Sequence, residues 1–332
     1  MSIISRSPFH DETAAFDYLE KTLWPQGAVC PHCGTVGNAT KLQGSATRIG
    51  VWKCNEKACR KQFTVKVGTV FEHGRIPLHK MLQAAYLLCC SKKGCSSHQL
   101  HRILQVTYKT AWFLAHRIRE AMRDGSLAPM GGAGKFVEVD ETFVGTIEGE
   151  GGKKAARARK KHQHYRGWGH KNIVLTLVER GGSARSFHID TTSVAQVVPL
   201  VQANIARESR LMTDEGQEFK TVGETFTSHD TVNHRAEEYV RDTGAVVFPT
   251  GERYVIHTNT VEGYYSIFKR GMKGIYQHCS EKHLHRYLAE FDFRYSNRVA
   301  LGVDDTARTT KALKGIVGKR LTYRWPHGTA AE

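Results

Sequence analysis

Four of the eight cysteines stand in two close pairs, and this pattern limits what the first part of the chain can fold into. The first pair lies in CPHCG at 30–34 and the second in CNEKAC at 54–59, which gives C-x2-C, 20 intervening residues and C-x4-C. Two such turns brought together place four thiolates around one ion, in the tetrahedral arrangement that zinc prefers. We therefore predict one structural Zn²⁺ that folds a small module, bound by Cys30, Cys33, Cys54 and Cys59.

Two other interpretations of the cysteine pattern stay open. Four unmetallated cysteines in a small core would show the same spacing, and His32, inside the first pair, could replace one thiolate as a ligand. Disulfides are less favoured, because the stretch MSIISRSPFHDETAAF lacks the apolar core and cleavage site of a signal peptide. No run approaches the roughly eighteen apolar residues of a membrane span. We therefore expect a cytoplasmic protein with reduced thiols and no membrane partner.

The segment after the cysteines has the apolar spacing of three consecutive helices. The first lies in PLHKMLQAAYLLCCSKKG and ends near Gly94. The second, SSHQLHRIL, has Ser96 and Gln99 at capping-box spacing, and Thr107 can cap the third, YKTAWFLAHRIREAM. Two helices joined by a short turn, with basic residues on the second, indicate a helix-turn-helix module, although a generic helical hairpin has the same periodicity.

A helix-turn-helix module places the start of its second helix against the bases of the major groove. We therefore expect base contacts from Thr107, Lys109 and Thr110, which begin that helix. We expect Arg102 and Arg117 to contact phosphates, which position the protein without reading the sequence.

The chain carries 48 Lys and Arg against 32 Asp and Glu, a formal net charge of +16. Such an excess is typical of proteins that bind a polyanion, usually nucleic acid, and a surface that is basic only for solubility is the alternative. The densest run, KKAARARKKHQHYR, has no apolar period, so 146–170 is predicted to be a mobile basic loop. Its expected DNA contacts are Lys153, Lys154, Arg157 and Arg159, and a later basic pair, Lys269 and Arg270, adds to them.

A stretch rich in Gly, Pro and Ser, DGSLAPMGGAGK at 124–135, has the composition of a domain boundary. The sequence KFVEVDETFVG that follows it predicts a buried strand with Asp140 in its middle. A carboxylate there is costly unless it pairs with Lys or Arg or binds a cation. Asp140 is therefore the first candidate for a catalytic acid.

Later segments continue with alternating strands and helices. NIVLTLVERGGSARSFHID predicts two strands joined by a Gly-Gly turn, a helical stripe follows at 194–205, and SRLMTDEG predicts a short strand ending at Asp214. The amphipathic segment TVNHRAEEYV comes next, with Asp230 as its expected N-cap. HTNTVEGYYSIFKRGMKG then predicts a helix with Glu262 and Lys269 on one face. This order is that of the RNase H-like fold.

Three carboxylates, those of Asp140, Asp214 and Glu262, would come from the first strand, a later strand and a helix. Acids placed in this way can hold two divalent ions on either side of a scissile phosphate. Mg²⁺ suits an open site of oxygen ligands that keeps several waters, and Mn²⁺ can replace it. The histidines near these acids, His229, His234 and His257, have no role that the sequence alone defines.

Motifs spread over nearly the whole chain resemble one family. They are WPQGAVCPHCG, FTVKVGTVF, SSHQLHRILQVTYKTAWFLAHRIREAM, VEVDETFVG, LMTDEG, HTNTVEGYYSIFKRG and KHLHRYLAEFDFRYSNR. Together they resemble the insertion-sequence transposases that join an N-terminal zinc ribbon to a DDE catalytic domain of the integrase type. The resemblance implies cut-and-join DNA transposition with Mg²⁺. It carries the acid triad over to Asp140, Asp214 and Glu262, with Lys269 as a helper.

The third position of that triad has two candidates. Some members of the group carry Asn there, and Asn259 lies one helical turn before Glu262. We prefer Glu262, because a carboxylate binds Mg²⁺ more strongly than a neutral amide does.

The expected fold class is a multidomain chain of a small zinc ribbon, a helical helix-turn-helix module and an α/β RNase H-like catalytic domain with a mixed sheet. The expected boundaries are an N-terminal helical segment at 1–27, the zinc ribbon at 28–72, the helix-turn-helix module at 73–125, a linker at 126–134, the DDE domain at 135–300 and a basic C-terminal tail at 301–332.

The predicted function is a DNA transposase that binds the terminal inverted repeats of an insertion sequence and joins them to target DNA. Holding two ends together requires at least a homodimer during the reaction, and binding to DNA would place the protein on the nucleoid. Two alternatives remain from the sequence. A repair or resolving nuclease of the same fold would cut DNA without joining ends. A DNA-binding regulator would use the zinc ribbon and the helix-turn-helix module with an inactive catalytic domain.

Overall fold

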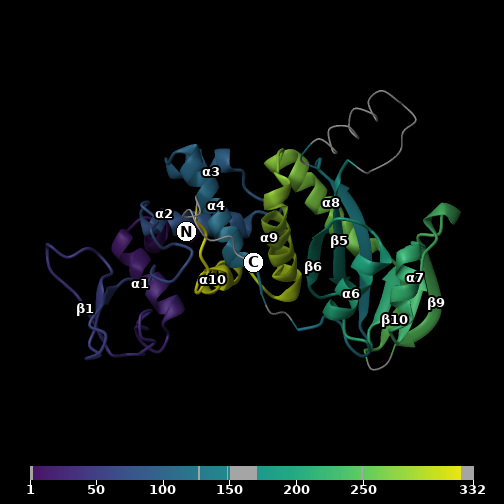
Figure 1. Ribbon diagram of the computed structural model, residues 1–332, viewed down its shortest axis with the longest axis horizontal. Coiled ribbons are helices and arrows are strands. Elements are labelled where there is room, and N and C mark those ends of the chain that lie inside the picture. Colours follow the sequence, from purple (N-terminus) through teal and green to yellow (C-terminus); the bar gives the residue numbers. More distant parts are fainter. Residues whose placement is uncertain (1–2, 126–127, 148, 150–169, 248–249, 323–332) are drawn as a thin grey trace. The chain divides into compact units, whose positions relative to one another are not determined.

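The computed structural model describes residues 3–125, 128–147, 149, 170–247 and 250–322. The chain divides into two compact units, which can be followed along the colour scale of Figure 1. Unit 1 consists of Met1–Arg123 and Val303–Glu332, and unit 2 consists of Asp124–Gly302. Among the helices in the described ranges, none combines the length and the apolar character needed to cross a bilayer.

Unit 1 begins with a helical segment and a small sheet. The helices are η1 (Ile3–Ser5), η2 (Ser7–Phe9) and α1 (Glu12–Leu23), and the antiparallel strands are β1 (Ala39–Lys41), β2 (Trp52–Cys54) and β3 (Gln62–Phe63). The buried core beside this sheet consists of Ala28, Cys30, Cys54 and Phe63, with Trp24 and Trp52 packed against it. So few apolar side chains do not stabilise a fold by themselves, which is consistent with a metal-bound module.

Three helices follow in unit 1: α2 (Leu78–Cys90), α3 (Ser97–Leu104) and α4 (Tyr108–Met122). Two of the expected helix caps are confirmed, because the hydroxyls of Ser96 and Thr107 accept the backbone N–H groups of Gln99 and Thr110 at 3.1 and 3.3 Å. The turn between α3 and α4 contains Gln105 in the left-handed region, with φ of 52°. The sequence therefore sets the ends of these helices locally.

The expected basic tail at 301–332 differs from the structure over its described part. After η6 (Val299–Leu301), residues Asp305–Lys314 form helix α10, which packs against α2. Ala312, Leu313 and Ile316 are buried, and the guanidinium of Arg308 donates to the carbonyl of Cys89 at 3.0 Å. Ala312 and Leu313 give α10 a face for the core, and Ile316 follows directly after the helix, so this segment completes unit 1.

Unit 2 is built on a five-stranded mixed sheet. In chain order its strands are β4 (Phe136–Val144), β5 (Asn172–Glu179), β6 (Ala184–Ile189), β7 (Arg210–Thr213) and β8 (Ser228–Thr231). Their order across the sheet is β6-β5-β4-β7-β8, with β4, β5 and β6 antiparallel and both β7 and β8 parallel to β4. The longest strand, β4, therefore lies at the centre of the sheet.

Helices cover both faces of this sheet (Figure 1). One face packs against α6 (Val194–Asn204) and α7 (Gln217–Gly223), and the other against α8 (Asn259–Gly271) and α9 (Leu284–Ser296). Val137 and Val139 of β4 belong to the core beneath α6 and α7. Because side chains alternate along a strand, Glu138 and Asp140 point to the α8 side.

Two expectations for unit 2 are corrected. Asp230 is not the N-cap of a helix, because it lies in β8 and accepts a hydrogen bond from the Tyr254 hydroxyl. The region after it instead contains η3 (His234–Ala236) and an antiparallel hairpin of β9 (Val240–Val247) and β10 (Glu252–His257). Part of the expected linker at 126–134 is also fixed, since Met130 is buried and pairs with Ile205. The remaining helices of the described residues are η4 (Met272–Tyr276) and η5 (Glu281–His283).

Candidate functional site

The four paired cysteines converge in unit 1. Their Sγ atoms all lie within 4.8 Å of one another, at 3.8 Å for Cys30 and Cys59 and 3.7 Å for Cys33 and Cys54. A tetrahedral site with Zn–S bonds of about 2.3 Å has S–S edges of about 3.8 Å, so the cluster fits one Zn²⁺. Burial and the neighbouring thiols raise the pKa of Cys54 to about 12, so four thiolates here require a cation. His32 is exposed and is not part of the cluster.

The three predicted acids come together in unit 2. Asp140 lies in the middle of β4, Asp214 directly follows the neighbouring strand β7, and Glu262 lies in the first turn of α8. Burial, the charge of Asp214 and the charge of Glu262 raise the pKa of Asp140 to about 7, while Lys269 acts in the opposite direction. These four side chains therefore share one electrostatic environment, in which the negative charges exceed the positive one.

The side chains of this acidic site offer carboxylate oxygens, which are the ligands that Mg²⁺ prefers. The site is also open to solvent, since the Glu262 side chain is 47% exposed. Within the described ranges, only the four cysteines bring three or more potential metal ligands within 4.8 Å of one another. The three acids are therefore spaced more widely than the ligands of one closed site. Such spacing is compatible with two ions, because each ion then needs only some of the carboxylates.

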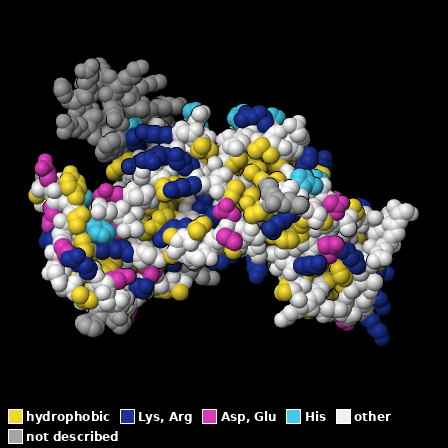
Figure 2. Space-filling view, turned by 180° about the vertical axis from the view of Figure 1, so that it is seen from behind, with side chains coloured by type: hydrophobic (Ala, Val, Ile, Leu, Met, Phe, Trp, Pro, Cys, Tyr) yellow, Lys and Arg dark blue, Asp and Glu magenta, His cyan; other side chains and the backbone are white. Residues whose placement is uncertain are grey.

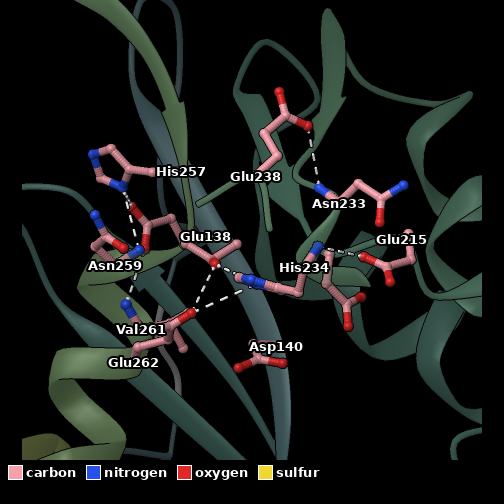
Figure 3. Close-up of polar contacts among 12 residues, drawn as sticks. Glu138, Asp140, Glu215, Asn233, His234, Glu238, His257, Asn259, Val261 and Glu262 are labelled. Carbon is pink, nitrogen blue, oxygen red and sulfur yellow. Dashed lines mark hydrogen bonds and ion pairs between the residues drawn. The ribbon is translucent and has the colours of Figure 1, made fainter. Parts of the chain in front are cut away.

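A buried carboxylate that the sequence analysis missed fixes the helix that carries Glu262. Glu138 is fully buried, and its oxygens accept the backbone N–H groups of Thr260 and Val261 at 2.7 and 2.9 Å (Figure 3). The side chain of Arg180 donates to Glu138 at 2.6 Å, and the ring of His257 lies 3.1 Å from it. Glu138 thus satisfies the free N–H groups at the start of α8.

The charge of Glu138 is stable in this position. Burial alone would raise its pKa, but the hydrogen bond from His257 and the charge of Arg180 lower the pKa below its usual value. One signal in the sequence could have revealed this residue: in VEVDETFVG, Glu138 stands two positions before Asp140 and so shares its face of the strand.

Replacing Glu138 by Gln should lower the free energy of unfolding of the protein by about 3 kcal/mol, because it leaves Arg180, whose side chain is only 15% exposed, without its counter-charge. Chemical denaturation followed by fluorescence measures this change. Glu252→Gln, at an exposed position of β10, is the matched control and should leave the unfolding free energy unchanged. Equal stabilities of the two variants would contradict the anchoring role of Glu138.

Glu262 also has close neighbours from the segment before α8 and from η3. The hydroxyl of Thr258, which is buried, donates to Glu262 at 3.3 Å. The Nε2 atom of His234 lies 3.6 Å from the Glu262 carboxylate, and the backbone N–H of His234 donates to Glu215 at 3.0 Å (Figure 3). Thr258 and His234 therefore lie against the Glu262 carboxylate, and the sequence did not reveal these contacts.

The remaining predicted catalytic residues lie on α8. Asn259 is its first residue, and Figure 3 shows it on the His257 side, whereas Glu262 lies on the Asp140 side. Lys269 is exposed, and its ammonium lies 5.8 Å from the ring of Tyr265, whose hydroxyl donates to the Asp140 carbonyl at 2.5 Å. Arg270 is exposed beside it.

The predicted DNA-binding residues of unit 1 lie around α3 and α4. Thr107 caps α4, and Lys109 in its first turn is exposed. Thr110 is half-buried, and its hydroxyl lies 2.9 Å from that of Thr107. Arg102 on α3 is exposed, while the Arg117 guanidinium lies 4.7 Å from the ring of Phe113.

The basic loop at 146–170 is described only at its two ends, where the backbone N–H of Ile147 donates to the carbonyl of His170 at 2.9 Å. Its predicted contacts lie outside the described residues: Lys153, Lys154, Arg157 and Arg159.

Comparisons with known proteins match both units. Residues 131–296 match the sequence model of the ISXO2-like transposase domain, and residues 10–62 match that of a transposase zinc-ribbon domain. A relative from Halobacterium salinarum, described as an uncharacterized protein in transposable element ISH50, is 28% identical over 293 residues. That match covers 86% of this chain and 91% of the relative.

Proposed function

Because the chain belongs to the family of transposases with an ISXO2-like domain, we propose that it binds the terminal inverted repeats of an insertion sequence and catalyses Mg²⁺-dependent strand cleavage and strand transfer. The observation that carries this proposal is the convergence of Asp140, Asp214 and Glu262 from β4, β7 and α8. Such an enzyme works in the cytoplasm on the nucleoid and acts at least as a homodimer when it holds two ends.

The topology of unit 2 supports an RNase H-like fold for the catalytic domain. Three antiparallel strands are followed by two strands parallel to the first, and helices cover both faces. The central strand carries the first acid, as the sequence order requires. The fold alone does not define the chemistry, so the proposal depends on the acids.

In this mechanism Asp140, Asp214 and Glu262 would hold the catalytic metal ions. Two bound Mg²⁺ ions would activate the attacking hydroxyl and stabilise the charge on the leaving oxygen. The chain's own residues position the reaction: Glu138 fixes the start of α8, and His234 orients the Glu262 carboxylate. Lys269 and Arg270, exposed in the last turn of α8, are placed to bind the DNA backbone.

Unit 1 is proposed to recognise the DNA. Helices α3 and α4, joined by a turn at 105–107, support a helix-turn-helix interpretation with α4 in the major groove. Lys and Arg side chains also lie on both units in the face shown in Figure 2, in accordance with the net charge of +16. Such charge favours sequence-independent attraction to DNA.

Lys109→Ala should reduce the discrimination between element ends and random DNA by about 1–3 kcal/mol, because one base contact is lost. The measurement is the ratio of the two dissociation constants at fixed salt. Arg102→Ala is the matched control, and it should weaken binding to both DNAs alike. It should also reduce by about 1 the magnitude of the slope of log affinity against log salt concentration. If Lys109→Ala also weakens both equally, Lys109 contacts only phosphate.

A cleavage and strand-transfer assay tests the function. The purified protein is incubated with Mg²⁺, DNA that carries the inverted repeats flanking its gene, and a target plasmid. Cleaved ends joined to the target support a transposase. Cleaved ends without joining favour a nuclease, and binding without metal-dependent cleavage favours a regulator.

A further inference from the structure

Unit 1 contains a cavity of about 840 Å³ that the proposed base-reading helix does not use. Its walls come from α1, from residues 47–49 of the zinc ribbon, and from 64–66 and 72–75 after β3. Three of the side chains that line it are cationic: Arg48, Lys66 and Arg75. A space of this size between charged side chains is large enough for a ligand.

A second cavity of about 210 Å³ adjoins the first, because both are lined by Glu72 and His73. It adds Arg117 from α4 and Arg320 from the segment after α10. We refer to the two cavities together as the basic cleft, defined by Arg48, Lys66, Arg75, Arg117 and Arg320.

Cations outnumber acids by five to two in the lining of the basic cleft, and the charge of Glu72 acts on Arg117 without an ion pair between them. In the part of the chain that the structure describes, none of the five cations forms an ion pair, and Lys66 donates to the carbonyl of Gly74 at 3.3 Å. The Nε of Arg117 is buried and has no acceptor among the described residues. An unsatisfied buried donor is costly, so it indicates an absent acceptor.

The two acids that line the cleft also accept hydrogen bonds from the backbone. The Glu12 carboxylate accepts the N–H groups of Leu78 and His79 at the start of α2, at 2.7 and 3.1 Å. Glu72 accepts the N–H of Gly68 at 3.2 Å. These carboxylates therefore stabilise the walls, while the cations that line the cleft still outnumber them.

Three of these cations, Lys66, Arg48 and Arg117, are also close enough to repel one another. Burial lowers the pKa of Lys66, and the charges of Arg48 and Arg117 lower it further, while Glu12 acts in the opposite direction. A bound anion would remove this repulsion and supply the acceptor that Arg117 lacks.

We propose that the basic cleft binds the phosphodiester backbone of double-stranded DNA. This inference rests on the proposed function for the identity of the ligand, since the geometry itself requires only phosphate-like anions. Five cations spread over two adjoining cavities match several phosphates better than one, and a DNA strand presents consecutive phosphates. The zinc ribbon then contributes directly to DNA binding, because it holds Arg48 and Lys66 in place on one side of the bound backbone.

The test uses the full-length, zinc-loaded protein and the double variant R48Q/R75Q, in which both altered side chains are exposed. Its control is K21Q/K314Q, which removes two exposed charges of unit 1 from outside both cavities. Affinity for an element-end duplex and a random duplex is measured across a range of salt concentrations. Because R48Q/R75Q loses two phosphate contacts, the slope of the logarithm of its DNA association constant against the logarithm of salt concentration should be flatter by about 1.8. Its binding should also be at least about tenfold weaker at about 0.15 M salt.

The expected result is that R48Q/R75Q weakens binding to both duplexes far more than the control does, with unchanged zinc content and unfolding temperature. Equal salt slopes of DNA binding for the two double variants would overturn the cleft proposal. The proposed function would remain intact in that case, provided that the parent protein binds DNA. Parent protein that binds no duplex would instead overturn the proposed function. Titration with inorganic phosphate is the last arm. If the parent binds phosphate saturably, and R48Q/R75Q loses this binding but keeps its affinity for DNA, the cleft binds a small anion and the proposal is refuted.

Discussion

Asp214→Asn is expected to reduce strand cleavage to background while binding to element ends persists. The substitution keeps the size of the side chain but removes the charge that holds a divalent ion. Loss of a residue that merely supports a metal ligand costs about 10–100-fold in activity, so loss of a ligand should cost more than about 100-fold. Cleavage of an end-containing duplex with Mg²⁺ and with Mn²⁺ measures the effect, and a binding assay on the same DNA is the control.

The third acid can be assigned in the same assay. Glu262→Gln should behave like Asp214→Asn, since Glu262 contributes to the raised pKa of Asp140 and contacts Thr258 and His234. Asn259→Ala should retain most activity. The opposite pattern, an active Glu262→Gln with an inactive Asn259→Ala, would assign the third position to the amide. Normal cleavage by both Asp214→Asn and Glu262→Gln would exclude the two-metal mechanism.

Cys54→Ser is expected to release the zinc ion and unfold the ribbon. Cys54 is completely buried at the end of β2, and its module has few other apolar residues in its core. In peptides of similar size, structural zinc contributes roughly 10–16 kcal/mol, which this small core does not replace. The parent should contain about one zinc per chain, as one closed site requires. Metal analysis and hydrogen exchange over 28–63 measure the loss.

Cys90→Ser is the control for that experiment. Cys90 is a half-buried thiol on α2 outside the cluster, so this variant should keep its zinc. Full zinc retention in Cys54→Ser would rule out the four-cysteine site.

The local features of the chain could be predicted from its sequence because their causes are local. The cysteine pairs lie on short turns, and the caps at Ser96 and Thr107 act over three residues. The acids of β4 and β7 could be found because a carboxylate inside or directly after an apolar strand stands out.

The interactions that complete the site could not be predicted, because they join distant parts of the chain. Glu138 binds Arg180, which is 42 residues away, and Thr260, which is 122 residues away. No periodicity records such a pairing. The hairpin of β9 and β10 was also missed, because β9 presents no alternating apolar face to a core: its residues are exposed until the last one, Val247.

The return of the chain to unit 1 through α10 has a consequence for synthesis on the ribosome. Unit 2 is inserted into unit 1, since residues 124–302 separate the first part of unit 1 from the helix that completes its core. Ala312, Leu313 and Ile316 are translated after the whole catalytic unit. A chain that ends before α10 therefore leaves apolar surface of α2 uncovered, so unit 1 is expected to reach its full stability only after the catalytic unit has been synthesised.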